Sequence, residues 1–314
     1  MKKSARNRII LWSVVSSLLI AVMIFSIFSL SNKFSNDFTF NGMGWSFGYG
    51  IPSGNDSSDF SVGGGNIDAD KVKSVNIKWV SGEINVQPSS DNKISFSEYM
   101  MDDKSDPMKY RLTPDGTLEI YGSPTLFFIR LFSSADDRKN LTVYVPQNKQ
   151  FTDFNISGIG TDITAKELNS SESTFETTSK SINISGFSGG ELALKSVSGD
   201  ITVLNANCDS VSLENVSGES SFSGKCREFD GNSVSGRIKT EFGGDISDID
   251  LGTVSGEAEI TMPKNISGFK AEHETVSGRF SADFPGKSNG NEFVFGDGRV
   301  SVDVETVSGD ISIK

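Results

Sequence analysis

Three aspartates lie close together in one glycine-flanked segment and could act together on a ligand. They are Asp245, Asp248 and Asp250, in GGDISDIDLG (243–252). Clustered carboxylates hold cations such as Ca²⁺ or perform acid–base catalysis on polysaccharides. The spacing fits no EF-hand loop, however, and the glycine-rich nonapeptide of calcium-binding β-rolls is missing. We therefore expect a solvated turn here, and another in MMDDKSD (100–106).

His273, in KAEHETV, is the single histidine of the chain. One histidine excludes a metal site built from several imidazoles. No recognisable pairing of a nucleophile with its base accompanies it. We expect an exposed strand residue, and we predict a protein that is not an enzyme, with no catalytic residue, no metal site and no cofactor.

Cys208 and Cys226 are the two cysteines, and they occupy near-equivalent positions in consecutive repeats. Cys208 follows Gly199 by nine residues, and Cys226 follows Gly218 by eight. Neighbours of this kind fall within the Cα separation that a disulfide tolerates. The alternative is a pair of small apolar core residues, because side chains that point the same way suit a bridge poorly. The sequence leaves both alternatives open.

The phrase Val-Ser-Gly recurs through the chain, usually followed by a charged residue and alternating apolar residues. TTSKSINI (177–184) aligns with the same phrase and has Lys180 in the glycine position. A period near 20 residues, made of strands and turns, is typical of a β-solenoid. We therefore predict an all-β fold, a parallel β-solenoid of the single-stranded β-helix type with about 20 residues per coil. Its repeat-turn glycines are Gly158, Gly199, Gly218, Gly236, Gly256, Gly278 and Gly309.

Side-chain alternation within one repeat predicts which residues face the core. Val197, Ile201 and Val203 have the same parity and are expected to share the inward face, with a bend at Gly199. Stacked coils would place the serines before the glycines in one ladder and the residues after the glycines in another. In the second ladder the charges alternate from the second rung onward, which favours the correct register. Its members are Asp200, Glu219, Arg237, Glu257, Arg279 and Asp310.

The N-terminal region carries a membrane signal. Basic residues in positions 1–8 precede an uncharged apolar segment, residues 9–30, which is long enough to span a bilayer. The basic residues predict that positions 1–8 stay in the cytoplasm, so the chain would be a single-pass protein of the cell membrane with its bulk outside. The alternative is a signal peptide that is cleaved after Ser31.

Composition divides the rest of the chain. Residues 31–69 are rich in Gly, Ser and aromatic residues without a steady period, as in a tether. Residues 70–149 form short alternating strands, and residues 150–314 carry the repeats of the solenoid. With about 20 residues per coil, side chains fill the space between the sheets, so we expect function on the outer faces.

The net charge of −12 argues against a nucleic-acid partner, because phosphate binding requires a basic face. The final interval between repeat glycines is longer than the others and contains FPGKSNGNEFVFGDG (284–298), while the sequence stops on a strand at Ile313 and Lys314. We expect one of two arrangements. Either 284–298 folds across the last coil, or the last coil is an open edge that binds another β-chain or oligomerises.

Three features resemble the bacterial "putative adhesin" family: VNIKWVSGEINV (75–86), RKNLTVYVPQN (138–148) and the serial VSGDI coils. The resemblance covers about residues 70–314. It implies a cell-surface domain of β-strand repeats with unknown function, often anchored by one N-terminal membrane helix. Some members are encoded with envelope-stress regulators in Gram-positive bacteria. The family offers no catalytic residues to carry over.

Two functions from different classes remain. The sequence favours a non-enzymatic surface module, adhesin-like or associated with envelope stress, whose partners would be the membrane through residues 9–30 and a protein or cell-wall polymer. The alternative is a β-helical enzyme acting on cell-wall or matrix polysaccharide. We favour the first because no catalytic constellation is recognisable.

Overall fold

The computed structural model describes residues 59–100, 107–122 and 139–314. The predicted cytoplasmic end, the membrane helix at 9–30, most of the tether and most of the turn at 100–106 lie outside the described residues. Among the described residues, no helix combines the length and apolar character needed to cross a membrane. Phe60–Lys314 is one compact unit.

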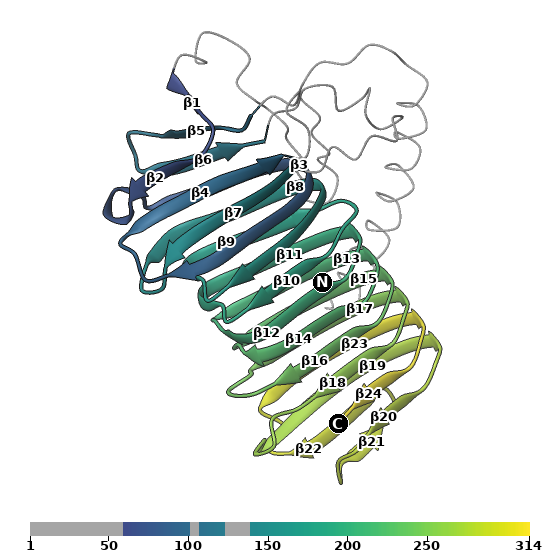
Figure 1. Cartoon of the computed structure of the whole chain (residues 1–314). Coiled ribbons are helices and arrows are strands. Elements are labelled where there is room, and N and C mark those ends of the chain that lie inside the picture. The colour runs from purple at the N-terminus through teal and green to yellow at the C-terminus, as the bar shows by residue number, and fades with distance from the viewer. Residues whose placement is uncertain (1–58, 101–106, 123–138) are drawn as a thin grey trace, which may run out of the picture. The chain divides into compact units, whose positions relative to one another are not determined.

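This unit is all-β and consists of two layers of strands that face each other across a hydrophobic core (Figure 1). Each repeat contributes one strand to layer I, turns a corner, and contributes one strand to layer II. We call such a pair of strands a rung. Rings from the two layers meet inside, because the ring of Phe229 in layer I lies 5.2 Å from that of Phe222 and 5.4 Å from that of Phe242 in layer II.

Within each layer the strands follow one another in a fixed order of pairing. Layer I contains β1 (Ser61–Val62), β5 (Lys109–Leu112), β6 (Thr117–Tyr121), the first half of β3 (Ser74–Ser89), the first half of β8 (Gln150–Lys166), β9 (Asn169–Thr177), β11 (Ser188–Ser198), β13 (Ser210–Ser217), β15 (Glu228–Ser235), β17 (Asp248–Ser255), β23 (Val300–Ser308), β19 (Gly268–Ser277), β22 (Glu292–Gly296) and β21 (Lys287–Asn289). Layer II contains β2 (Gly65–Asp68), β4 (Lys93–Met100), β7 (Lys139–Pro146), the second halves of β3 and β8, β10 (Ile182–Ser185), β12 (Ile201–Asn207), β14 (Ser220–Lys225), β16 (Ile238–Phe242), β18 (Ala258–Thr261), β24 (Ile311–Ile313) and β20 (Phe280–Ala282).

Successive rungs pair in parallel, with equivalent repeat positions side by side. Ile182 pairs with Ile163 on one side and with Ile201 on the other. The predicted serine ladder is present where the layer I strands end. Its spatial order is Ser198, Ser217, Ser235, Ser255, Ser308 and Ser277. The Val-Ser-Gly segments therefore lie one above another, as the repeat predicts.

The spatial order of the last rungs differs from their order in the chain. In layer I, β23 lies between β17 and β19. In layer II, β24 lies between β18 and β20, so the last rung of the chain is inserted before the preceding one (Figure 1). The segment 284–298 makes this possible, because β22 runs antiparallel to β19 and returns the chain to the inner position. The expectation of an open edge at Ile313 is therefore wrong, since β24 is paired on both sides. The outer edge is formed by the short strands β20 and β21.

Aromatic side chains close the core at this end of the stack. The ring of Phe269 on β19 lies 5.1, 5.7 and 5.8 Å from the rings of Phe284, Phe293 and Phe295. These three residues belong to the segment 284–298. Of the two arrangements expected from the sequence, the structure therefore has the one in which this segment folds against the terminal rung.

The chain is threaded in a similar way at the other end of the stack. β3 runs through both layers and lies between β8 on one side and β6 and β7 on the other. Its corner is Ser81-Gly82, so the stack of rungs starts well before the boundary predicted at residue 150. Residues 61–68 were predicted to belong to the tether, but they form β1 and β2, which pair antiparallel with β5 and β4.

Val197 does not face the core as predicted. It is half-buried on the outer side of β11, whereas Ser196 is fully buried. A corner at Gly199 separates β11 from β12, so the alternation does not continue into Ile201. Each rung from β11 onward places a polar residue inside the corner and a valine outside it. The buried polar residues before the corners include Thr177, Ser196, Asn215, Ser233, Thr253 and Thr306.

Carbonyl groups at the corners give some of these buried polar side chains partners, whereas the hydroxyls of Ser233, Thr253 and Thr306 have no hydrogen-bond partner in the described part of the chain. The hydroxyl of Thr177 donates to the carbonyl of Thr161 at 2.8 Å, and the Asn215 amide donates to the carbonyl of Gly199 at 3.0 Å. At Thr177 and Asn215 the polar side chain therefore satisfies a backbone carbonyl at the corner.

Gly158 is not a corner glycine, although it follows a serine as the others do. It lies inside β8, and the corner of that rung is Gly160-Thr161, which pairs with Ser81-Gly82. The match of Gly158 to the repeated phrase is therefore out of register with the stack.

The other repeat glycines mark the place where neighbouring rungs approach most closely. A Cβ on Gly256 would collide with the carbonyl group of Gly236, and a Cβ on Gly309 would collide with that of Gly256. The same contact recurs at Gly199 and Gly278. Close approach of backbone to backbone explains why the phrase keeps glycine.

Candidate functional site

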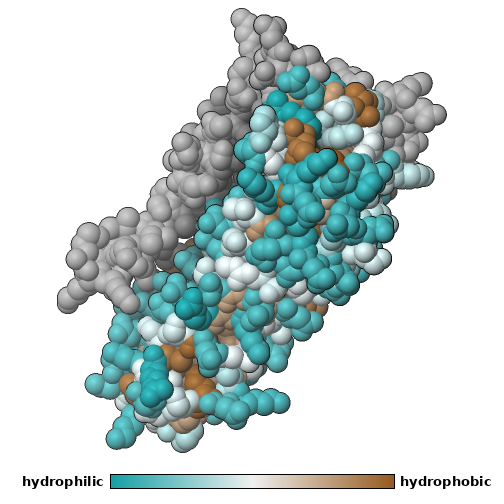
Figure 2. All heavy atoms as spheres, turned by 90° about the vertical axis from the view of Figure 1, so that its left-hand side faces the viewer, coloured by the Kyte–Doolittle hydropathy of each residue, from teal (hydrophilic) through white to brown (hydrophobic). Residues whose placement is uncertain are grey.

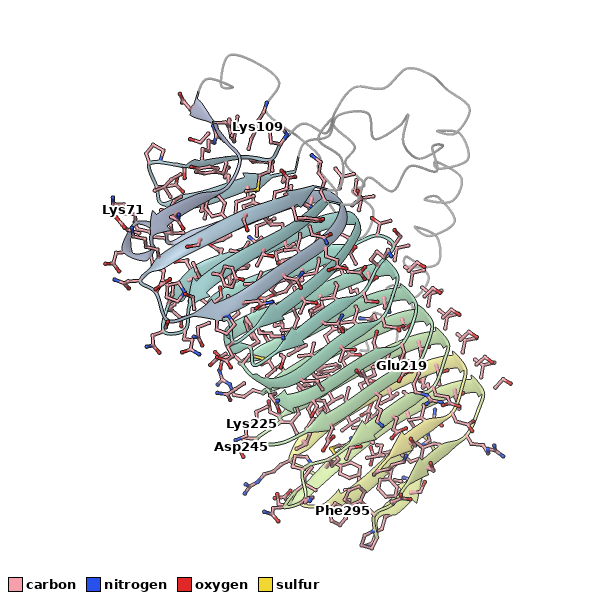
Figure 3. The ribbon with its side chains drawn as sticks, in the orientation of Figure 1. Lys71, Lys109, Glu219, Lys225, Asp245 and Phe295 are labelled. Atoms are coloured by element: carbon pink, nitrogen blue, oxygen red, sulfur yellow. The ribbon has the colours of Figure 1, made fainter. Side chains whose placement is uncertain are left out.

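The three aspartates of 243–252 do not form one site. Asp248 and Asp250 both point to the outward side of β17, with the buried Ile249 between them, whereas Asp245 lies in the turn before that strand. Figure 3 shows Asp245 next to Lys225, on the side of the stack opposite the corner that carries Glu219. Among the described residues, no group of three or more His, Cys, Asp or Glu side chains is placed to hold a metal ion.

Asp248 and Asp250 belong instead to an extended negative surface, which we call the acidic face. It consists of the outward side chains of layer I from β9 to β19. Asp230, Asp250 and Asp303 are stacked on neighbouring strands, and Glu228 pairs with Asp248 in the same way. The acidic residues of this face are Glu172, Glu176, Glu191, Glu214, Glu228, Asp230, Asp248, Asp250, Glu272, Glu274, Asp303 and Glu305.

Positive charge is sparse on the described strands of the acidic face. Lys195 lies 3.7 Å from Glu214, and Lys270 lies 2.7 Å from Glu292. Desolvation by neighbouring chain atoms and the negative charge of Glu214 raise the pKa of Asp230. Like charges on adjacent strands destabilise a sheet, so a cationic partner would relieve repulsion on this face.

Layer II presents a different outer surface on the middle rungs. Its outward residues are mainly hydroxyl and amide side chains in stacked positions, such as Thr164, Asn183, Thr202 and Ser221. The two outer faces of the stack therefore offer different chemistry, one negative and one neutral.

The predicted charge ladder beside the corner glycines is present, but its order changes at the end. An Arg237 nitrogen lies 2.6 Å from a Glu257 oxygen, and Arg279 lies 3.4 Å from Asp310. Because the rung of β24 is inserted, Glu257 is followed in space by Asp310, and two like charges meet where alternation was predicted. Exposed pairs of this kind add little stability and act mainly on register.

A hollow of about 500 Å³ interrupts the outer surface where β12, β14 and β16 end. The hollow results from a bulge, because the register between β12 and β14 shifts between Leu204 and Ala206. Asn205 occupies the bulge with a φ of 56°. The residues that line the hollow are Asn205, Ala206, Asn207, Ser223, Gly224, Lys225, Glu241 and Gly243.

The sequence contains a signal for this bulge. Cys208 lies nine residues after its corner glycine and Cys226 only eight after its own, and the extra residue is Asn205. The hollow itself is not visible in the sequence, because its lining residues come from three rungs.

Cys208 and Cys226 are free thiols, and both are buried. Burial raises the pKa of each thiol to about 12. Both groups therefore remain protonated at neutral pH and are poor nucleophiles. Of the two alternatives left open by the sequence, the structure has the pair of small core residues.

His273 is not the exposed strand residue that we expected. It is half-buried on β19, where its ring stacks on that of Phe280 with centroids 3.7 Å apart and planes within 4°. Burial lowers its pKa, and its Nε2 atom has no hydrogen-bond partner among the described residues. His273 therefore packs as part of the aromatic end of the core.

We predict that His273 makes the stability depend on pH. Because its pKa is lower in the folded than in the unfolded chain, the unfolded chain binds the proton more readily, and the free energy of unfolding should fall as the pH drops below 6.5. Urea unfolding at about pH 7.5 and about pH 5.5 should show a larger loss for the wild type than for His273→Phe, which keeps a ring on Phe280. Asp230, with its raised pKa, acts in the opposite direction in both proteins. Equal losses in the two proteins would contradict the prediction.

The family model described as Toastrack DUF4097 matches residues 59–314. A comparison with curated proteins finds no match. Solved structures that are similar include a "putative cell adhesion protein" from Clostridium sporogenes, with 15% identity over 81% of this chain and 97% of that chain and a TM-score of 0.28. They also include a "putative adhesin" from Bacteroides fragilis, with 13% identity, 82% and 98% coverage and a TM-score of 0.48.

A "putative lipid binding protein" from Parabacteroides distasonis is also similar, with 16% identity, 82% and 98% coverage and a TM-score of 0.40. With TM-scores below 0.5, these likenesses do not bear on the ligand or partner of this chain. The family model, in contrast, covers most of the chain, including every described strand, and it confirms the resemblance seen in the repeated motifs. The chain belongs to the Toastrack DUF4097 family.

Proposed function

We propose that this protein is a non-enzymatic cell-surface module, adhesin-like or associated with the envelope-stress response, that binds through the outer faces of its stack. The observation that carries this proposal is the acidic face, which continues over consecutive rungs from β9 to β19. A surface made of stacked repeats suits an extended partner, such as a protein segment or a wall polymer.

The interior supports the same proposal. Side chains from both layers fill one continuous core, so the described part of the stack holds its ligand-accessible groups on the outside. The carboxylates first considered for catalysis are separated, with Asp248 on the acidic face and Asp245 in a turn near Lys225. Glycoside hydrolysis requires two carboxyl groups on either side of one bond.

We place the protein at the cell membrane in this proposal. Residues 9–30 would act as the single-pass anchor, with residues 1–8 in the cytoplasm and the stack outside. The acidic composition fits this arrangement, because a negative stack is repelled by anionic lipid headgroups and would stand away from the bilayer.

Site-specific crosslinking in intact cells tests the proposal. A photoreactive amino acid is placed at Glu191 or Glu228 on the acidic face, and at Asn183 or Ser221 on layer II as matched controls. We expect partner crosslinks mainly from the acidic positions, and fewer of them from Glu228 when Asp248→Asn removes a neighbouring charge. Equal crosslinking at all four positions, or turnover of wall polysaccharide by the purified protein that Asp248→Asn abolishes, would refute it.

A further inference from the structure

We infer that the hollow at the ends of β12, β14 and β16 binds one saccharide unit of a surface polymer. This inference deepens the proposed function, on which it rests, because it names the chemistry of one partner. It uses residues that are distinct from those of the acidic face, so the two can be tested separately.

The hollow lies where the register changes along layer II. The rungs of β8, β10 and β12 each carry a residue with positive φ after the paired strand, namely Glu167, Gly186 and Asn205, whereas β14 lacks this residue and continues in register with β16. A bulge of this kind costs stability that a regular strand would retain. Departures from local regularity concentrate at ligand sites, where they re-aim side chains.

The polar side chains of the hollow are not committed to the rest of the described chain. Asn205, Asn207, Ser223, Lys225 and Glu241 line it, and their side chains form no hydrogen bond or ion pair with described residues. Lys225 and Glu241 carry opposite charges but form no ion pair with each other.

Charged residues at comparable exposed positions do pair between rungs. Arg227 binds Asp209 at 2.8 Å, and Lys314 lies 3.0 Å from Glu259. Against this background, the unpaired Lys225 and Glu241 leave an ammonium and a carboxylate available to a ligand. Figure 3 places Lys225 on the left-hand side of the stack, the side that faces the viewer in Figure 2, where mainly hydrophilic side chains surround apolar patches.

The mixture of groups in the hollow selects the class of ligand. Two carboxamides, a hydroxyl, an ammonium and a carboxylate supply donors and acceptors together. A sugar ring presents hydroxyls that both donate and accept, so it satisfies this set without the repulsion that a ligand of a single charge would meet at Lys225 or at Glu241.

The shape of the hollow agrees with a sugar ring. Gly224 and Gly243 leave its base without side chains, and a Cβ on Gly224 would lie 2.6 Å from the carbonyl oxygen of Ala206. The volume of about 500 Å³ is within the range of small-ligand sites.

A panel of oligosaccharides tests the inference on the full chain in detergent micelles. The panel contains N-acetylhexosamine oligomers and peptide-free glycan strands from bacterial cell walls, and binding is measured by calorimetry. We expect at least one saccharide to bind with a Kd of about 1 mM, as for a small ligand in an open site. Asn207→Ala and Glu241→Ala should each weaken binding about tenfold, whereas Asn183→Ala, an exposed amide of layer II outside the hollow, should not change it.

Deletion of Asn205 is an independent second variant, because it should align β12 with β14 and remove the hollow together with binding. Failure of every saccharide to bind the wild type, binding that is unchanged in Asn207→Ala and Glu241→Ala, or binding of zwitterionic peptides alone would overturn the inference. The crosslinks from Glu191 should persist in these variants. If saccharide binding stays intact but the acidic positions crosslink no more than the layer II controls, the role of the acidic face is overturned instead.

Discussion

Deletion of residues 300–314 should unfold the end of the stack rather than shorten it by one rung. β23 separates β17 from β19, and β24 separates β18 from β20, so the deletion leaves a gap inside both layers. Each buried aliphatic side chain contributes about 1.5–3 kcal/mol, and their sum approaches the whole stability of a typical domain, about 5–15 kcal/mol. The buried residues that are lost are Val300, Val302, Val304, Ile311 and Ile313.

Size-exclusion chromatography with light scattering measures the outcome of this deletion. Unpaired edges on β17 and β18 should recruit other chains, so we expect oligomers and aggregates. A synthetic peptide of residues 299–314 should restore the monomer, because it can pair on both sides, whereas a peptide with Val302→Asp and Val304→Asp should not. A truncated protein that stays monomeric, with an unchanged unfolding midpoint, would show that the inserted rung is dispensable.

Gly256→Ala should be strongly destabilising, although it adds only one methyl group to the described stack. The new Cβ would meet the carbonyl group of Gly236, which is backbone and cannot rotate away. Relief of this clash requires separation of two rungs at their corner, and we expect a loss of about 3 kcal/mol in the free energy of unfolding. Thermal unfolding should then begin at a temperature lower by about 5–10 °C.

Gly160→Ala is the matched control, because Gly160 also lies at a corner. A Cβ at this position would be 3.6 Å from the nearest atom, the carbonyl oxygen of Val80, which is an ordinary contact. We expect a change of less than about 1 kcal/mol, measured by denaturant unfolding of both variants. Similar losses in the two variants would mean that the close approach of the corners does not explain the repeated glycines.

The stacking of the repeats could be predicted from the sequence because the spacing of the repeated phrase determines which residues of neighbouring rungs pair. Ser198, Ser217 and Ser235 lie side by side as their spacing requires, and the glycines that follow them meet at the corners. The corner also explains the error at Val197, since alternation holds within a strand but not across a turn. Gly158 also follows a serine but lies inside β8 and not at a corner, so a Ser-Gly pair alone does not determine the register.

The order of the rungs could not be predicted in the same way. Nothing in the repeat distinguishes β23 from β19 as a neighbour of β17, because both present a serine and a valine in the same positions. The outcome depends on the packing of Phe284, Phe293 and Phe295 around Phe269, which involves residues outside the repeated phrase.

The two candidate surfaces differ in how visible they are in the sequence. The acidic face could have been found by aligning the positions that precede each Val-Ser-Gly, where Asp230, Asp250 and Asp303 recur. The hollow could not, because Asn207, Lys225 and Glu241 come from three rungs and converge only once the bulge at Asn205 is formed.

The inserted rung also determines how the stack responds to mechanical load. A strand at the edge of a sheet can be peeled away by breaking one ladder of hydrogen bonds at a time. β24 is flanked by β18 and β20, so tension applied at residue 314 must break two ladders together. Under such tension the stack would therefore yield first at other strands, and this rung would be among the last to be pulled out.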